Sequence, residues 1–145
     1  MDRNLVTQKI ISAKVKNKMT WCKIAESIGQ SKEWTTAAML GQMTLTARQA
    51  AVAQELFDLT DEETLWLQIV PYKGSLPTPT DPLIYRWYEI VSVYGSTIKE
   101  LIHEEFGDGI MSAIDFKMDI QRQADPNGDR VNVMLSGKFL PYKTY

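Results

Sequence analysis

A proline-rich segment near the middle of the chain separates two parts of different character. Residues 71–82 read PYKGSLPTPTDP, with four prolines and one glycine in twelve positions. Proline lacks the backbone N–H that helices and central strands require, so this composition predicts an extended linker. We therefore expect a helical domain over residues 1–70 and a second domain over residues 83–145.

The first domain is predicted to be a bundle of about five short helices joined by tight turns. Residues 4–16 carry apolar side chains at helical spacing. Each of the next four segments follows a hydroxyl residue that can cap a helix, and glycines end two of them. The caps are Thr20, Ser31, Thr46 and Thr60, the last forming a capping box with Glu63, and the glycines are Gly29 and Gly41.

Two of these helices have the spacing of a helix-turn-helix (HTH). Ala25 permits close packing and Gly29, four residues later, permits the turn. A DNA-reading helix would begin with Arg, Asn or Gln, but residues 32–36 are Lys-Glu-Trp-Thr-Thr, and Glu33 would repel phosphates. Residues 1–60 hold eight Lys or Arg against five Asp or Glu, a weak positive charge for a nucleic-acid binder. We favour a structural bundle with HTH-like geometry over a DNA-binding regulator, and predict no nucleic-acid partner.

The second domain is predicted to contain helices followed by a β-hairpin, which makes the fold class α+β. The apolar pattern predicts one helix over residues 83–94, ended by Gly95, and another over residues 96–106, ended by Gly107. From Met111 the period changes to two, which is typical of a half-buried strand. A DPNGD turn at residues 125–129, a second alternating stretch and an extended tail from Gly137 follow.

This hairpin needs apolar cover from outside its own two strands. An isolated two-stranded hairpin is barely stable in water, and the chain has few further strands to offer. Another copy of the chain is the natural source of cover, since an unpaired sheet edge invites pairing. We expect a homo-oligomer, with a purely structural oligomerisation module as one of the functions that the residues leave open.

The composition limits the compartment and the chemistry. One cysteine, Cys22, cannot form an internal disulfide or a multi-cysteine metal site, and we expect it to be a small buried hydrophobe. No apolar run approaches the length of a membrane span, and the first twenty residues do not resemble a secretory signal. These features predict a cytoplasmic protein without a membrane partner.

Several residues that could suggest catalysis are better explained otherwise. The single histidine, His103, lies beside glutamates on a helix, where a solvated or packing role is expected. The acidic residues lack the fixed spacing of a metal loop, so we predict no metal site; they are Glu104, Glu105, Asp115 and Asp119. The FGDGI stretch lacks the frame of a phosphate-binding loop.

Arg86 and Glu89 within the sequence YRWYE are the remaining candidates. They lie three residues apart on one helix face, where an exposed ion pair would contribute little. The same helix is apolar around much of its circumference, which is typical of a buried helix, and a buried arginine needs a partner or a bound anion. The residues alone leave both interpretations open.

Long stretches of the sequence resemble the cyanase family, also called cyanate hydratase or cyanate lyase. The similarity is most specific in PTDPLIYRWYEIVSVYGSTIKELIHEEFGDGIMSAIDFKMD, residues 79–119, and continues in GKFLPYK at residues 137–143. It extends to IAESIGQSKEWTTAAMLGQMTL and LWLQIVP in the first domain, whereas residues before Thr20 match poorly.

The resemblance implies an active site formed by Arg86, Glu89 and Ser112, which match the family's arginine, glutamate and serine. It implies a reaction in which bicarbonate attacks cyanate to give carbamate and carbon dioxide, and carbamate then decays to ammonia and carbon dioxide. Bicarbonate is a co-substrate, and no cofactor is implied. The family's subunits pair through interlaced C-terminal strands into an intertwined dimer with an intersubunit sheet, and five dimers form a decamer with sites between subunits.

The implied chemistry brings two small anions together. Arg86 would supply a permanent cation with a planar fork of donors, and Ser112 would supply neutral donors. Glu89 is expected to orient Arg86 of its own chain or of a neighbouring subunit, with a proton-carrying role as the alternative. The resemblance leaves open whether the cell uses the reaction for cyanate detoxification or for nitrogen metabolism.

Overall fold

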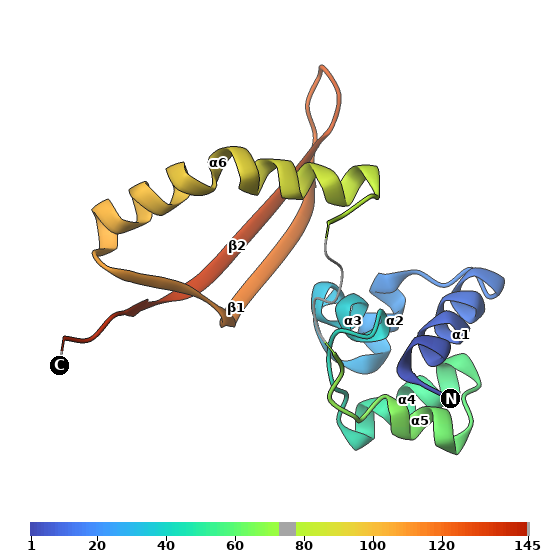
Figure 1. Ribbon diagram of the computed structural model, residues 1–145. Helices are drawn as coiled ribbons and strands as arrows, with labels where there is room; N and C mark the ends of the chain where they lie inside the picture. Colours follow the sequence, from blue (N-terminus) through green and yellow to red (C-terminus); the bar gives the residue numbers. More distant parts are fainter. Residues whose placement is uncertain (73–77, 145) are drawn as a thin grey trace. The chain divides into compact units, whose positions relative to one another are not determined.

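The computed structural model describes residues 1–72 and 78–144. The chain divides into two compact units, Met1–Ser75 and Leu76–Tyr145. Part of the predicted linker, residues 73–77, lies outside the described residues, and each unit is treated by itself (Figure 1).

The first unit contains the five helices that the sequence predicts. They are α1 (Arg3–Lys16), α2 (Trp21–Ile28), α3 (Lys32–Met39), α4 (Ala47–Phe57) and α5 (Asp61–Trp66). Thr20, Ser31, Thr46 and Thr60 cap α2 to α5 as expected, each accepting a hydrogen bond from a backbone N–H in the first helical turn. Gly29 adopts the left-handed conformation that ends α2, which a residue with a side chain would adopt only with strain.

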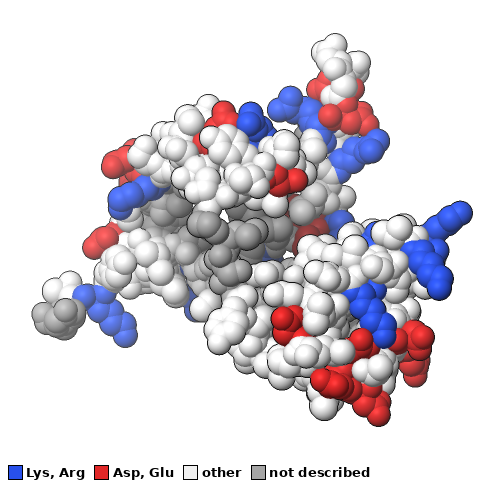
Figure 2. Space-filling model, turned by 45° about the vertical axis from the view of Figure 1, so that its right-hand side comes forward, with Lys and Arg blue, Asp and Glu red and all other residues white. Residues whose placement is uncertain are grey.

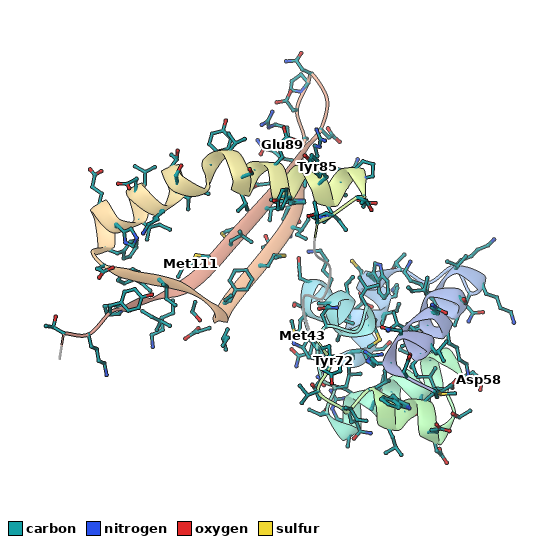
Figure 3. The ribbon with its side chains drawn as sticks, viewed as in Figure 1. Met43, Asp58, Tyr72, Tyr85, Glu89 and Met111 are labelled. Atoms are coloured by element: carbon teal, nitrogen blue, oxygen red, sulfur yellow. The ribbon has the colours of Figure 1, made fainter. Side chains whose placement is uncertain are left out.

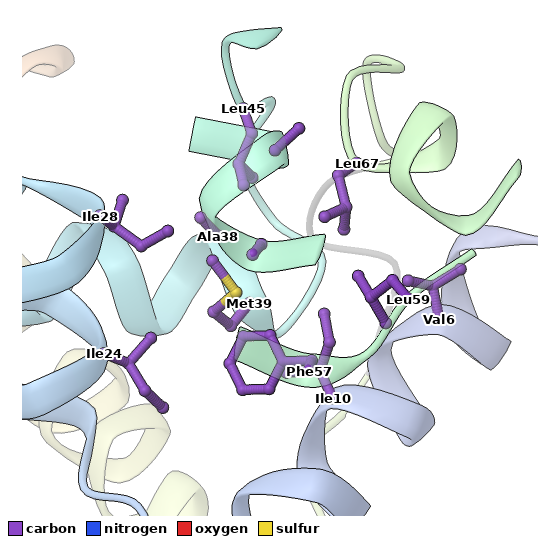
Figure 4. Close-up of a cluster of buried hydrophobic side chains, with 12 residues drawn as sticks. Val6, Ile10, Ile24, Ile28, Ala38, Met39, Leu45, Phe57, Leu59 and Leu67 are labelled. Atoms are coloured by element: carbon purple, nitrogen blue, oxygen red, sulfur yellow. The ribbon is translucent and has the colours of Figure 1, made fainter. Parts of the chain in front are cut away.

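The core of the first unit is a single apolar cluster (Figure 4). Phe57 from α4 lies among side chains from α1, α2 and α3, including Ile10, Ile24 and Met39, all almost completely buried. Burying an aliphatic or aromatic side chain of this size stabilises a fold by roughly 1.5–3 kcal/mol. This unit therefore encloses its own hydrophobic core.

The prediction that Cys22 is buried is wrong. Cys22 is exposed, because the buried face of α2 is defined by Ile24, Ala25 and Ile28. Cys22 lies two residues before Ile24, and at about 100° per residue its side chain points away from that face.

The second unit contains one helix where the sequence predicts two. α6 runs from Pro82 to Phe106 without interruption and passes through Gly95. An internal glycine costs only about 1 kcal/mol relative to alanine, which the surrounding helix formers tolerate. The helix begins at the Asp81 cap, with Pro82 in the first turn, and ends at Gly107.

The predicted hairpin is confirmed, so the chain is α+β. β1 (Gly109–Gln123) pairs antiparallel with β2 (Arg130–Pro141), with the turn between them (Figure 1). The expected tail from Gly137 is instead part of β2, because residues up to Pro141 pair with the start of β1. The register shifts between Met111 and Phe116, which marks a bulge in β1.

The second unit leaves most of its apolar side chains exposed. None of the 25 residues of α6 is buried, and Ile114 of β1 is 97% exposed. The end of α6 contacts the hairpin through Phe106, whose ring stacks on Phe139 at 5.1 Å between centroids. The half-buried strand that the sequence predicts is thus not buried by the single chain.

Candidate active site

Arg86 and Glu89 form an ion pair on α6. The Arg86 Nη1 and Glu89 Oε2 atoms are 3.1 Å apart, as the spacing of three residues predicts. Their side chains are 62% and 49% exposed, so within one chain the pair lies at the surface. A single chain therefore does not bury Arg86, which was one of the two interpretations that the sequence left open.

Aromatic side chains flank this ion pair. The Arg86 guanidinium lies 5.3 Å from the centre of the Tyr85 ring, and the Tyr85 and Tyr88 rings are 6.0 Å apart. A ring face attracts a guanidinium and supports its planar orientation. Glu89 and Tyr85 together restrain the Arg86 side chain. The guanidinium N–H groups that do not bond to Glu89 can donate to a ligand.

Ser112 lies inside β1, within the bulge. Its residue is only 6% exposed, and Gly109 and Ser112 alone are buried among the described residues of this unit. The Ser112 Oγ accepts hydrogen bonds from the backbone N–H groups of Ile114 at 3.0 Å and Asp115 at 2.9 Å. Since these donors occupy both lone pairs of the hydroxyl oxygen, the hydroxyl proton remains available to a ligand.

One chain does not bring the three predicted site residues together. Arg86 and Glu89 are paired, but no hydrogen bond joins either of them to Ser112 in the described part of the chain. Figure 3 shows Glu89 in the N-terminal half of α6 and Met111, the neighbour of Ser112, elsewhere along the hairpin.

A shallow depression borders the bulge on the hairpin. Its volume is about 330 Å³, and its lining includes none of the three predicted site residues. It is lined by Asp115, Phe116, Lys117, Ser136, Gly137 and Lys138. The depression that these six residues line is therefore open to solvent and is not an enclosed cavity.

His103 is held in a local hydrogen-bond arrangement at the end of α6. Its Nδ1 is 2.9 Å from the Gly107 carbonyl oxygen, which can only accept, and its Nε2 is 2.7 Å from Lys99 Nζ. These partners fit a neutral imidazole with its proton on Nδ1. His103 thus has a structural partner at the helix end, a role that its sequence position alone did not specify.

His103 and the acidic side chains form no metal cluster in the part of the chain that the structure describes. Among residues 1–72 and 78–144, no three His, Cys, Asp or Glu side chains gather in a way that could hold a metal ion.

No helix of the described chain has the length and apolar character to span a bilayer.

The surface of α3 offers little to a nucleic acid. Lys32 Nζ at its start is 2.5 Å from Glu33 Oε1, so a carboxylate accompanies the cation there. On the face shown in Figure 2, lysines and arginines lie in separate groups. The absence of a nucleic-acid partner remains a prediction.

Two family models match the chain in consecutive segments. One is described as cyanate hydratase, N-terminal, and matches residues 3–71; the other is described as cyanate lyase C-terminal domain and matches residues 77–144. Together they cover nearly the whole sequence.

Curated relatives and a solved structure agree with these matches. The cyanate hydratase of Polynucleobacter asymbioticus is 77% identical and that of Variovorax paradoxus 74% identical, each over the full length of both chains. A crystal structure of cyanase from T. urticae is 37% identical, covers 94% of this chain and 96% of its own, and superposes with a TM-score of 0.82.

Proposed function

The chain belongs to the cyanate hydratase family, and from this membership we propose that it is a lyase that decomposes cyanate in a bicarbonate-dependent reaction. The observation that carries the proposal is the 77% identity to a cyanate hydratase across the full length of both proteins. Cyanate, bicarbonate and one proton give carbamate and carbon dioxide. Carbamate then takes up a proton and decays to ammonia and carbon dioxide.

Bicarbonate is the nucleophile in this proposal, so the protein supplies none. A bicarbonate oxygen attacks the cyanate carbon, the bicarbonate proton passes to nitrogen, and the resulting mixed anhydride carries the charge of both anions. The bond between the bridging oxygen and the bicarbonate-derived carbon then breaks to release carbon dioxide, and nitrogen takes up one further proton to give carbamate. Fixed positive charge and oriented donors lower the barrier to such a step. Holding the two reactants in attack geometry contributes much of the remaining acceleration.

Arg86 is the proposed anion clamp. Its guanidinium can donate two parallel hydrogen bonds to one oxyanion, and Tyr85 and Glu89 restrain its plane. Glu89 is assigned to orienting Arg86 because its carboxylate oxygen lies 3.1 Å from the guanidinium. The hydroxyl of Ser112 donates to a substrate oxygen, which fits the two acceptor positions already occupied by backbone N–H groups.

The complete site is proposed to form between subunits. The exposed face of α6 and the exposed strand residues provide the apolar surface that an intertwined dimer would bury. Association would bring Ser112 of one copy toward Arg86 of another, and five such dimers would form the decamer. We propose a cytoplasmic location and no cofactor.

Ammonia release from cyanate, measured with and without bicarbonate, tests the proposed function. We expect rapid release only when both anions are present. Release that does not depend on bicarbonate, or no release from a protein that is assembled and folded, would refute it. Size-exclusion chromatography with light scattering tests the assembly, and a monomeric active enzyme would contradict the shared site.

A further inference from the structure

We infer that Gly137 is a positioning residue for Ser112; this inference rests on the proposed function. Gly137 lies in β2 at the edge of the bulge that contains Ser112. Met111 pairs with Phe139 and Phe116 pairs with Gly137, so four residues of β1 stand opposite Lys138 alone. Within this bulge the carbonyl oxygen of Ser112 lies beside Gly137.

The space beside Gly137 is filled by the backbone of Ser112. A β-carbon at position 137 would overlap the Ser112 carbonyl oxygen, and it would lie 2.6 Å from Cγ and 3.3 Å from Sδ of Met111. The first neighbour is a backbone atom, which cannot move aside as the end of a flexible side chain can. Gly137 does not have a positive φ, so the requirement for glycine is one of space and not of backbone conformation.

Displacing this carbonyl would disturb the hydroxyl of the same residue. The Ser112 Oγ is held by the N–H groups of Ile114 and Asp115, both within the bulge. The bulge conformation thus fixes the direction of the hydroxyl, and Gly137 permits that conformation. A displacement of about 1 Å in a catalytic arrangement can lower a rate by about 100-fold.

The test is Gly137→Ala in the full-length enzyme, with Gly95→Ala as the matched control. A β-carbon at Gly95 meets only a Val91 methyl carbon at 3.9 Å, an ordinary contact. We expect Gly137→Ala to lower kcat for assembled enzyme by about 100-fold, with a much smaller change in KM. Gly95→Ala is expected to retain the wild-type kcat.

Amide hydrogen exchange provides a readout that a general loss of stability would not give. In Gly137→Ala we expect faster exchange at Ile114 and Asp115, whose N–H groups bond to Ser112, and unchanged exchange in the paired strand beyond Phe116. A kcat within twofold of the wild type would overturn the inference. So would restoration of activity in Met111→Ala/Gly137→Ala, because the side chain of Met111 would then be the decisive neighbour.

A second variant covers the case in which Gly137→Ala does not fold. Ser112→Gly/Gly137→Ala gives the crowded backbone more conformational freedom, so it should recover soluble, assembled protein without activity. Failure to recover would overturn the inference by showing a wider structural role for Gly137. Wild-type protein without bicarbonate-dependent ammonia release would instead refute the proposed function, and a fully active Ser112→Ala would refute the assignment of Ser112.

Discussion

The two units of the chain place their apolar side chains differently. The first unit buries Phe57, Ile10 and Met39 in a core made from its own helices. In the second unit, α6 has no buried residue and much of the hairpin is exposed. Stability in the first unit is therefore a property of one chain, whereas the second unit needs a further layer. The proposed site residues all lie in the unit that one chain leaves unfinished.

Phe57→Ala should have the largest effect on stability and should act on the first unit alone. Removing a buried phenylalanine leaves a cavity and costs about 3–5 kcal/mol. Thermal unfolding followed by tryptophan fluorescence and circular dichroism should show an earlier transition that does not depend on protein concentration. An unfolding temperature of the first unit that changes with protein concentration would contradict the conclusion that this unit is stable as a single chain.

Arg86→Lys should abolish most activity while leaving both units folded. Lysine keeps the charge but cannot provide the planar fork, so we expect a loss of about 100–1000-fold in kcat/KM. Arg122→Lys is the control, because Arg122 pairs with Asp129 in the hairpin and not with a proposed site residue. A near-native rate in Arg86→Lys would contradict the anion clamp.

Ile114→Ala should weaken association rather than the folding of a chain. The side chain is 97% exposed in the single chain, so its loss should matter only if another copy covers it. Burial at a subunit interface would make the change cost about 2 kcal/mol per copy. Sedimentation across a dilution series measures this, with Val15→Ala, 70% exposed on α1, as the control. Equal behaviour of the two variants would argue against a covered hairpin.

Glu89→Gln distinguishes the two roles of Glu89. The amide oxygen can still accept from Arg86, so an orienting role predicts that most activity is retained. Loss of a general acid–base group would lower the rate by about 100-fold or more. Steady-state ammonia release gives the answer, and a loss that large would favour the proton carrier.

Acid should destabilise the first unit by protonating Glu63. This is the smallest of the expected effects. Hydrogen bonds from Lys9 Nζ and the Thr60 backbone N–H lower the pKa of Glu63 below its usual value. A carboxylate with a lowered pKa in the folded state stabilises the fold above its unfolded pKa, and this contribution is lost as the pH falls through the folded value. The melting temperature should decrease below about pH 4.3, where unfolded glutamate becomes protonated. Glu63→Gln should reduce this pH dependence, and an unchanged profile would rule out Glu63 as its source.

Local patterns predicted the first unit well because its signals are local. Thr20, Ser31, Thr46 and Thr60 each cap a helix through the backbone N–H only three residues later. The prediction that Gly95 ends a helix is wrong because a glycine can end a helix or lie inside one, and the sequence does not distinguish the two. The burial of Cys22 is predicted wrongly because a helix with a buried apolar face can still carry a small residue on its exposed face.

The site could be predicted only in part. The spacing of Arg86 and Glu89 gives their ion pair, since it depends on one helix. The proposed role of Ser112 rests on family resemblance, and its hydrogen bonds depend on a strand register that no local pattern specifies. The crowding at Gly137 depends on the same register, joining residues 25 positions apart along the chain.

The hydrogen bonding of Ser112 also has a consequence for inhibition of the proposed site. An oxygen whose lone pairs already accept two backbone N–H groups is a poor nucleophile. Fluorophosphonates and other acylating or phosphonylating reagents that trap serine hydrolases should leave Ser112 unmodified. Effective inhibitors of this chemistry would instead be compact, doubly charged anions that imitate the joined reactants and bind reversibly.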